Sequence, residues 1–172
     1  MRRITSILVV LLLVQGLLTL AYRAWEQHRT NDATFEVESI DLRAPPLQML
    51  GLTGPRSLDE LGDRTLLVHF WATWCPPCRE ELPGLIAATR STAVPLLAIT
   101  EEPWETVEAY FGGEVPPEIV RDPTGSGARR YGVSGLPDTY VVRQGRIVYR
   151  IGAARDWRAT GAQRWLTGLA ER

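Results

Sequence analysis

Apolar residues occur along the chain in runs of different length, and each run predicts a different kind of element. Residues 4–22 form an uncharged stretch dominated by Leu, Val and Ile, whereas residues 65–71 and 94–100 form shorter, mainly apolar runs. Continuous apolar runs of this shorter length are typical of strands buried on both faces, as in parallel sheets. The pattern therefore predicts one long apolar helix followed by a domain with a buried sheet.

The remainder of the chain alternates helical and strand patterns. Leu82, Leu85 and Ile86 recur at helical spacing, and Gly112-Gly113 is typical of a helix end. Gln144-Gly145 separates two strand-like runs and predicts a hairpin turn, and residues 51–55 predict another turn. The predicted strands are 47–50, 65–71, 94–100, 117–121, 139–143 and 146–151, and the predicted helices are 79–90, 104–111, 128–131 and 156–169.

This order of elements predicts the fold class. Strands alternating with helices indicate an α/β fold, and the final hairpin adds antiparallel strands to its sheet. We expect a mixed central sheet flanked by helices and preceded by a single N-terminal transmembrane helix. The corresponding domain organisation is a membrane anchor at 1–22, a polar spacer at 23–44 that merges into the first strand, and the folded domain at 45–172.

The first 22 residues resemble a membrane anchor. As a helix, residues 4–22 would span roughly 28 Å at about 1.5 Å per residue, close to the ~30 Å hydrocarbon core. Arg2 and Arg3 precede the run and should stay in the cytoplasm, which places the domain outside it. A cleaved signal peptide ending near Ala21 is the alternative. Both interpretations export the domain.

Composition excludes two classes of function. The chain of 172 residues is 45% hydrophobic and 23% charged with a net charge of −1, so it carries no basic field for nucleic acid. All 19 basic residues are arginine. Because lysine is missing, no lysine amine can act as a base or Schiff-base nucleophile.

The only two cysteines, Cys75 and Cys78, are three residues apart. A disulfide between them would close too short a loop to stabilise the fold much, but it would make a good reversible switch. A zinc site is the alternative, with His28 and His69 as further ligands, but His28 lies in the spacer and His69 in a buried strand. We expect no metal and no cofactor besides the redox-active disulfide.

The position of Cys75 favours a reactive thiolate. It follows a predicted strand and precedes a helix, where backbone N–H groups and the helix dipole stabilise an anion. Pro76 and Pro77 suit the first positions of that helix and restrict the geometry of the two sulfurs. We expect Cys75 to attack a partner disulfide and Cys78 to resolve the mixed disulfide.

Residues 67–78 read LVHFWATWCPPC, and this segment resembles the active site of the thioredoxin superfamily. The chain is most similar to the membrane-anchored bacterial branch represented by TlpA, ResA and CcmG, and the likeness runs from about residue 42 to the C-terminus. ScsD-like exported oxidoreductases also fit the tail between Trp157 and Leu166. The resemblance implies a thioredoxin-like sheet and thiol–disulfide oxidoreductase activity.

The same resemblance implies a substrate groove. Pro137 would be a cis-proline beside the disulfide, and Leu136 would offer backbone hydrogen bonds to an extended substrate. Trp74 is expected to border the groove, together with Pro76, whereas Trp71 is expected to pack in the core.

Two further residues are candidates for proton transfer. Glu81 lies one helical turn after Cys78, where the cytochrome-maturation branch carries a functional acid, and its pKa should rise if it is buried. The alternative is a solvated helix glutamate. His69 stands where thioredoxins carry a buried aspartate; it could shuttle the proton of Cys78, or be a neutral core histidine.

We therefore expect an exported, inner-membrane-anchored enzyme with its domain in the periplasm or cell exterior. It would reduce protein disulfides, for instance in apocytochromes before haem attachment, and would receive electrons from a membrane thiol donor. The alternatives are a disulfide oxidase or isomerase, and a redox-inert module that binds partners around Pro137.

Overall fold

The computed structural model describes residues 13–22, 35, 37–58 and 62–171. Its elements follow the predicted order closely, because the buried strands and amphipathic helices have distinct apolar patterns. The elements are β1 (Glu38–Arg43), β2 (Gln48–Gly51), β3 (Gly54–Ser57), β4 (Leu66–Phe70), α2 (Pro76–Thr92), β5 (Leu96–Thr100), α3 (Trp104–Phe111), β6 (Ile119–Arg121), α4 (Ser126–Tyr131), β7 (Asp138–Arg143), β8 (Arg146–Ile151) and α5 (Thr160–Ala170).

The strands form one mixed sheet, as predicted. The order is β1-β8-β7-β4-β5-β6-β2-β3, and β4, β5 and β6 run parallel at its centre. The antiparallel β7–β8 hairpin pairs with β4 on one side. Its turn has positive φ at both Gln144 (49°) and Gly145 (69°), the geometry of a tight two-residue hairpin turn.

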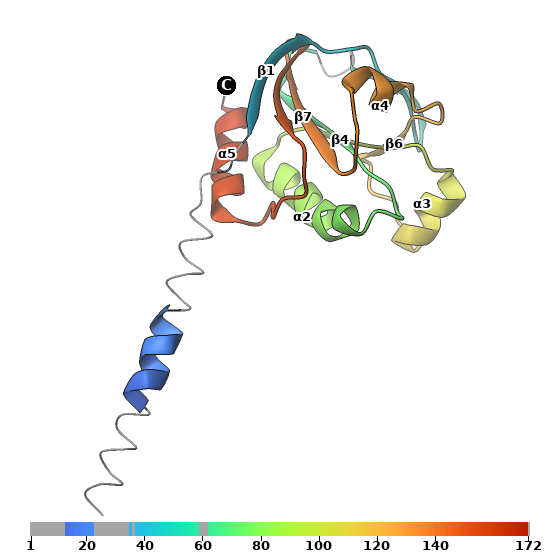
Figure 1. Ribbon diagram of the computed structural model, residues 1–172. Coiled ribbons are helices and arrows are strands. Elements are labelled where there is room, and N and C mark those ends of the chain that lie inside the picture. The colour runs from blue at the N-terminus through green and yellow to red at the C-terminus, as the bar shows by residue number, and fades with distance from the viewer. Residues whose placement is uncertain (1–12, 23–34, 36, 59–61, 172) are drawn as a thin grey trace, which may run out of the picture.

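Helices cover both faces of this sheet (Figure 1). Alternate residues of β4 point to opposite faces, so Leu67 packs in one apolar cluster while Val68 and Phe70 pack in the other. The first cluster includes Leu82 of α2 and Leu166 of α5. This packing holds α2 against the carboxyl end of β4, which is where the two cysteines lie.

The sheet is longer than predicted at its N-terminal end. β1 begins at Glu38, before the expected domain start at residue 45, and pairs with β8. β3 extends into the stretch predicted as a turn; only Leu52 and Thr53 form the turn between β2 and β3. Pro55 is compatible with β3 because that strand lies at the edge of the sheet.

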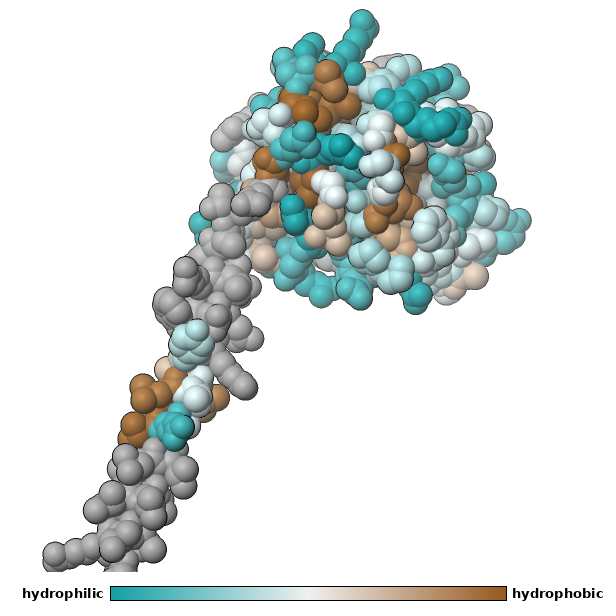
Figure 2. All heavy atoms as spheres, viewed as in Figure 1, coloured by the Kyte–Doolittle hydropathy of each residue, from teal (hydrophilic) through white to brown (hydrophobic). Residues whose placement is uncertain are grey.

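Residues 13–22 form a helix whose large apolar side chains are exposed, and Figure 2 shows these apolar residues together on it. Residues 4–12 of the predicted anchor lie outside the described residues. Among the described residues, no helix is both long enough and apolar enough to cross a membrane.

Candidate active site

The two cysteines lie where β4 passes into α2. Cys75 is the N-cap of α2, Pro76 and Pro77 open the helix, and the Cys75 Sγ accepts the Cys78 backbone N–H at 3.3 Å. A disulfide joins Cys75 and Cys78. Cys78 is wholly buried, whereas Cys75 keeps an exposed fraction of 3%. Cys75 is therefore the less buried of the two cysteines, at a position where backbone N–H groups favour a thiolate.

Trp74 and Pro76, two of the predicted substrate-binding residues, flank Cys75 in the chain. Trp74 is 71% exposed and Pro76 is exposed beside it. The Leu136–Pro137 peptide bond is cis, as the resemblance implied, and Pro137 leads directly into β7. Trp74 and Leu136 line one hollow of about 300 Å³, together with apolar residues from the carboxyl ends of β4 and β5.

Asp138 fixes the segment that follows Pro137. Its carboxylate is buried and accepts hydrogen bonds from the Arg150 guanidinium (2.9 Å) and the Tyr140 hydroxyl (2.8 Å). Hydrogen bonds from a charged donor are among the stronger ones in proteins. These contacts hold the Leu136–Pro137 loop against the hairpin.

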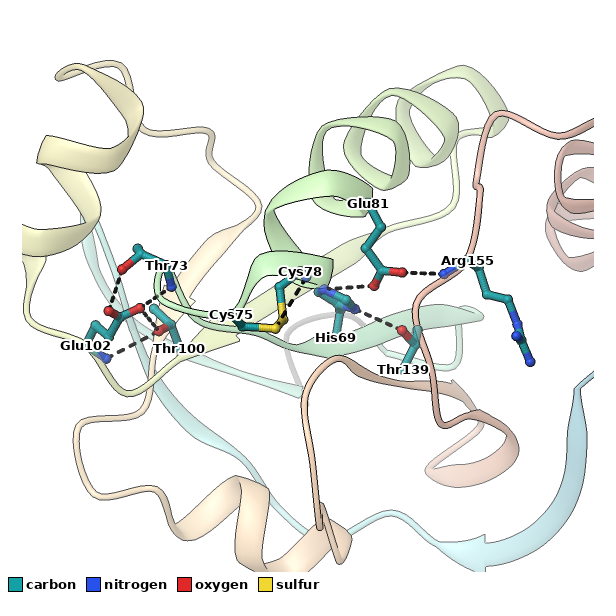
Figure 3. Close-up of a disulfide and its surroundings, with 9 residues drawn as sticks. All are labelled: His69, Thr73, Cys75, Cys78, Glu81, Thr100, Glu102, Thr139 and Arg155. Carbon is teal, nitrogen blue, oxygen red and sulfur yellow. Dashed lines mark hydrogen bonds and ion pairs between the residues drawn. A yellow bond between two sulfur atoms is a disulfide. The ribbon is translucent and has the colours of Figure 1, made fainter.

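One side of the disulfide, which we call the Glu102 flank, consists of Thr73, Thr100 and Glu102 (Figure 3). The Glu102 Oε2 accepts the Thr73 backbone N–H, and Oε1 accepts the Thr73 hydroxyl, both at 2.6 Å. The Thr100 hydroxyl also donates to Oε2, at 3.2 Å. Both oxygens of the carboxylate are thus hydrogen-bonded to neighbouring segments.

The opposite side, which we call the Glu81 flank, consists of His69, Glu81, Thr139 and Arg155 (Figure 3). The His69 Nδ1 lies 2.9 Å from the Thr139 hydroxyl, and its Nε2 lies 3.6 Å from the Glu81 Oε1. The Arg155 backbone N–H donates to the Glu81 Oε2 at 2.6 Å. These contacts connect β4, β7, α2 and the loop before α5 beneath the disulfide.

Burial changes the pKa values on the Glu81 flank. It raises the pKa of Glu81 to about 7, although the hydrogen bond from Arg155 lowers it, and it lowers the pKa of His69 to about 3. His69 is therefore neutral near neutral pH, and Glu81 titrates there. The His69 Nε2 and Glu81 Oε1 have no hydrogen-bond partner among the described residues. These two atoms face each other at 3.6 Å, which is beyond hydrogen-bond distance.

Glu81 also faces a second open hollow of about 300 Å³, on the side of α2 next to the loop before α5. Pro77, Trp157 and Arg158 line it with Glu81, and it shares no lining residue with the hollow beside Trp74. Glu81 thus lies one helical turn after the buried Cys78 and borders a hollow separate from the Trp74 side.

The fold brings the predicted site residues together around the disulfide. Sequence reasoning missed Thr73, Glu102 and Arg155. The sequence did contain one indication that Glu102 lies near the site. Glu102 follows β5, and the carboxyl ends of adjacent parallel strands share one edge of a sheet. His28, the other ligand considered for zinc, lies outside the described residues. In the described ranges no group of three or more His, Cys, Asp or Glu residues could hold a metal ion.

Comparisons with known proteins show that the chain is similar to thiol–disulfide oxidoreductases. Residues 40–151 match the model of the AhpC/TSA family. The chain is 31% identical over 146 residues to the thiol:disulfide interchange protein HelX of Rhodobacter capsulatus, covering 82% of each chain. It is 30% identical over 158 residues to the thiol-disulfide oxidoreductase ResA of Geobacillus thermodenitrificans, covering 87% of each. A solved structure titled as a putative thiol:disulfide interchange protein DsbE from Chlorobium tepidum superposes with a TM-score of 0.65 at 20% identity, covering 78% of this chain and 99% of that one.

The fold and the paired cysteines define a thioredoxin-like thiol–disulfide oxidoreductase. The chain belongs to the AhpC/TSA family, and the predicted resemblance to the bacterial branch of the thioredoxin superfamily represented by TlpA, ResA and CcmG is confirmed.

Proposed function

We propose that the protein reduces disulfides of exported proteins, with the cysteine disulfides of apocytochromes c as its substrate class. The observation that carries the proposal is the placement of Cys75. Cys75 is the N-cap of α2, is the less buried residue of the pair, and follows the exposed Trp74 directly in the chain. The names of the HelX and ResA relatives support thiol–disulfide exchange.

The reaction takes two exchange steps. The Cys75 thiolate attacks one sulfur of the substrate disulfide, a Cys75–substrate disulfide forms, and the other substrate sulfur leaves as a thiolate that takes up a proton. Cys78 then loses its proton to the Glu81 carboxylate and attacks the Cys75 sulfur. The Cys75–Cys78 disulfide forms, and the second substrate thiol is released. Two electrons have passed from the enzyme to the substrate.

The four residues around Cys75 have binding roles in this proposal. Trp74 and Pro76 present an exposed surface, and Leu136 offers its backbone to an extended substrate chain. Pro137 holds that backbone beside the disulfide. Glu81 acts as proton acceptor, and neutral His69 positions the Glu81 carboxyl through its Nε2 atom.

Residues 4–22 would anchor the protein in the bacterial inner membrane with its domain in the periplasm, or direct its export as a signal peptide. The exposed leucines of residues 13–22 support a membrane-facing segment. A reductase outside the cytoplasm needs a source of electrons, so a membrane thiol donor would return Cys75 and Cys78 to the dithiol form. Membrane fractionation with protease treatment of intact spheroplasts tests the location.

A direct test uses the reduced protein and an oxidised peptide with an intramolecular disulfide in a Cys-x-x-Cys-His segment, the haem-attachment sequence. We expect two peptide thiols to form for each enzyme disulfide, and a Cys75→Ser variant to be inactive. The reduction potential decides the direction: about −270 mV would support a reductase, and about −120 mV an oxidant, which would contradict the proposal.

A further inference from the structure

The turn between β4 and α2 is restrained by Glu102, a residue that follows the neighbouring strand β5. Within the turn, the Cys75 backbone N–H donates to the Ala72 carbonyl at 3.2 Å. Thr73, between these two residues, directs both its N–H and its hydroxyl away from the turn to Glu102. Glu102 follows β5, so its contact with Thr73 connects the carboxyl ends of two parallel strands (Figure 3).

Glu102 is itself fixed at several points. Its backbone N–H donates to the Thr100 hydroxyl, and its carbonyl accepts a hydrogen bond from Arg121 of β6. The two short bonds from Thr73 involve an ionised acceptor and are therefore stronger than neutral ones. A carboxylate restrained in this way limits where Thr73, and the two residues after it, can lie.

The restrained residues border the surface that would receive a substrate. Trp74, Glu102 and Leu136 line the same hollow of about 300 Å³. Leu136 is held independently, because Asp138 ties its loop to Arg150 and Tyr140. Glu102 therefore restrains one side of the hollow, and Asp138 restrains the other.

We propose that Glu102 is a positioning residue for substrate docking: by accepting both hydrogen bonds of Thr73, it sets the distance between Trp74 and the Leu136–Pro137 loop. The inference rests on the proposed function, because it assumes that an extended peptide docks there. It requires no contact between Glu102 and the reacting sulfurs. Loss of the carboxylate should weaken capture of a peptide more than attack on a small disulfide.

The test compares Glu102→Gln with the control Glu105→Gln, an exposed glutamate on α3. The two Thr73 bonds go to different oxygens of Glu102, and Gln replaces one of these oxygens by an NH₂ group and removes the negative charge that strengthens both bonds. Each reduced variant is mixed with the oxidised Cys-x-x-Cys-His peptide and, separately, with the small disulfide 5,5′-dithiobis(2-nitrobenzoate). Exchange of the Thr73 amide hydrogen, measured by NMR, reports the restraint without any substrate.

For Glu102→Gln we expect kcat/KM toward the peptide to fall about tenfold, the size of one hydrogen bond to a charged group, mainly through KM. The rate with the small disulfide should fall much less, and the Thr73 amide should exchange faster. Thr73→Ser, which keeps both bonds, should retain peptide activity, and Thr73→Val should lose part of it.

Equal losses on both disulfides, or unchanged exchange of the Thr73 amide, would overturn the inference. A wild-type protein that reacts with the small disulfide but never with the peptide would instead refute the proposed function. In that case the amide exchange still decides whether Glu102 restrains the turn.

Discussion

The two flanks of the disulfide differ in the burial and the hydrogen bonding of their carboxyl groups. On the Glu102 flank, both oxygens of an ionisable side chain accept hydrogen bonds from Thr73 and Thr100. On the Glu81 flank, the carboxyl is more deeply buried, and its Oε1 and the facing His69 Nε2 have no hydrogen-bond partner among the described residues. The Glu102 flank also borders the exposed Trp74, whereas the Glu81 flank lies beneath the buried Cys78.

This difference separates two tasks. A carboxylate whose two oxygens both accept hydrogen bonds keeps a fixed geometry, which suits a docking surface. A buried carboxyl with an unpaired oxygen gains or loses a proton near neutral pH, which suits acid–base chemistry. Glu102 is thus expected to position the substrate side of the site, and Glu81 to serve the proton transfer of Cys78.

Replacing either cysteine should have the largest effect on peptide reduction, because both flanks act through the Cys75–Cys78 pair. Cys75→Ser should abolish reduction of the Cys-x-x-Cys-His peptide. Cys78→Ser should carry out the first exchange only and accumulate the Cys75–peptide disulfide, which mass spectrometry under non-reducing conditions detects. A Cys75→Ser variant that cannot reduce the peptide but keeps full function in the cell would favour the redox-inert binding module considered from the sequence.

Glu81→Gln should have the second-largest effect, because it removes the proton acceptor but keeps an oxygen for the Arg155 N–H. Loss of a general base typically costs a factor of about 10² to 10⁴, and we expect the lower end for resolution of the mixed disulfide at pH 7. The rise of this rate through pH 7 in the wild type should disappear in the variant. Stopped-flow measurements from pH 5 to 9 provide the test, with Glu80→Gln, an exposed neighbour, as control.

The same carboxyl should affect folding stability. Because the folded pKa of Glu81 is about 7, above its usual 4.5, the folded protein binds the extra proton between these values and loses stability as pH rises through them. His69, with a lowered pKa, gives the opposite slope below 6.5. The difference between Glu81→Gln and wild type isolates the carboxyl: the variant should gain up to about 3 kcal/mol relative to wild type between pH 4 and 8. Urea unfolding of the oxidised proteins measures it, and a constant difference would contradict burial of Glu81.

His69→Asn should have the smallest effect, because His69 is neutral near neutral pH. The change should alter the rate of mixed-disulfide resolution by about threefold and should be non-additive with Glu81→Gln, since the two side chains face each other. A double-mutant cycle measures the coupling. Additive effects, with unchanged Cys75 pKa and reduction potential, would leave His69 as a core histidine only.

Much of the structure was predictable because apolar periodicity is local. The run at residues 65–71 and the helical spacing of Leu82, Leu85 and Ile86 indicated β4 and α2 with Cys75 at their junction. β3 was missed because the Gly and Pro of residues 51–55 were interpreted as a turn, although an edge strand accepts proline.

The contacts of the candidate site were less predictable because they join distant segments. Thr73 and Glu102 are 29 residues apart, and Glu81 and Arg155 are 74 apart. No local pattern marks the Arg155 backbone N–H as a donor. The burial of Glu81 was equally hidden, because it depends on how α2 packs against the loop before α5; sequence alone left a solvated glutamate as an equal alternative.

The central claim is that Cys75 is held as a reactive thiolate at the start of α2. The most direct measurement is the rate of alkylation of Cys75 in the reduced protein from pH 4 to 10, with each cysteine followed by mass spectrometry. We expect Cys75 to react first and to titrate clearly below the value of about 8.5 for a free cysteine. A Cys75 that titrates at or above that value, or that reacts no faster than Cys78, would contradict the claim.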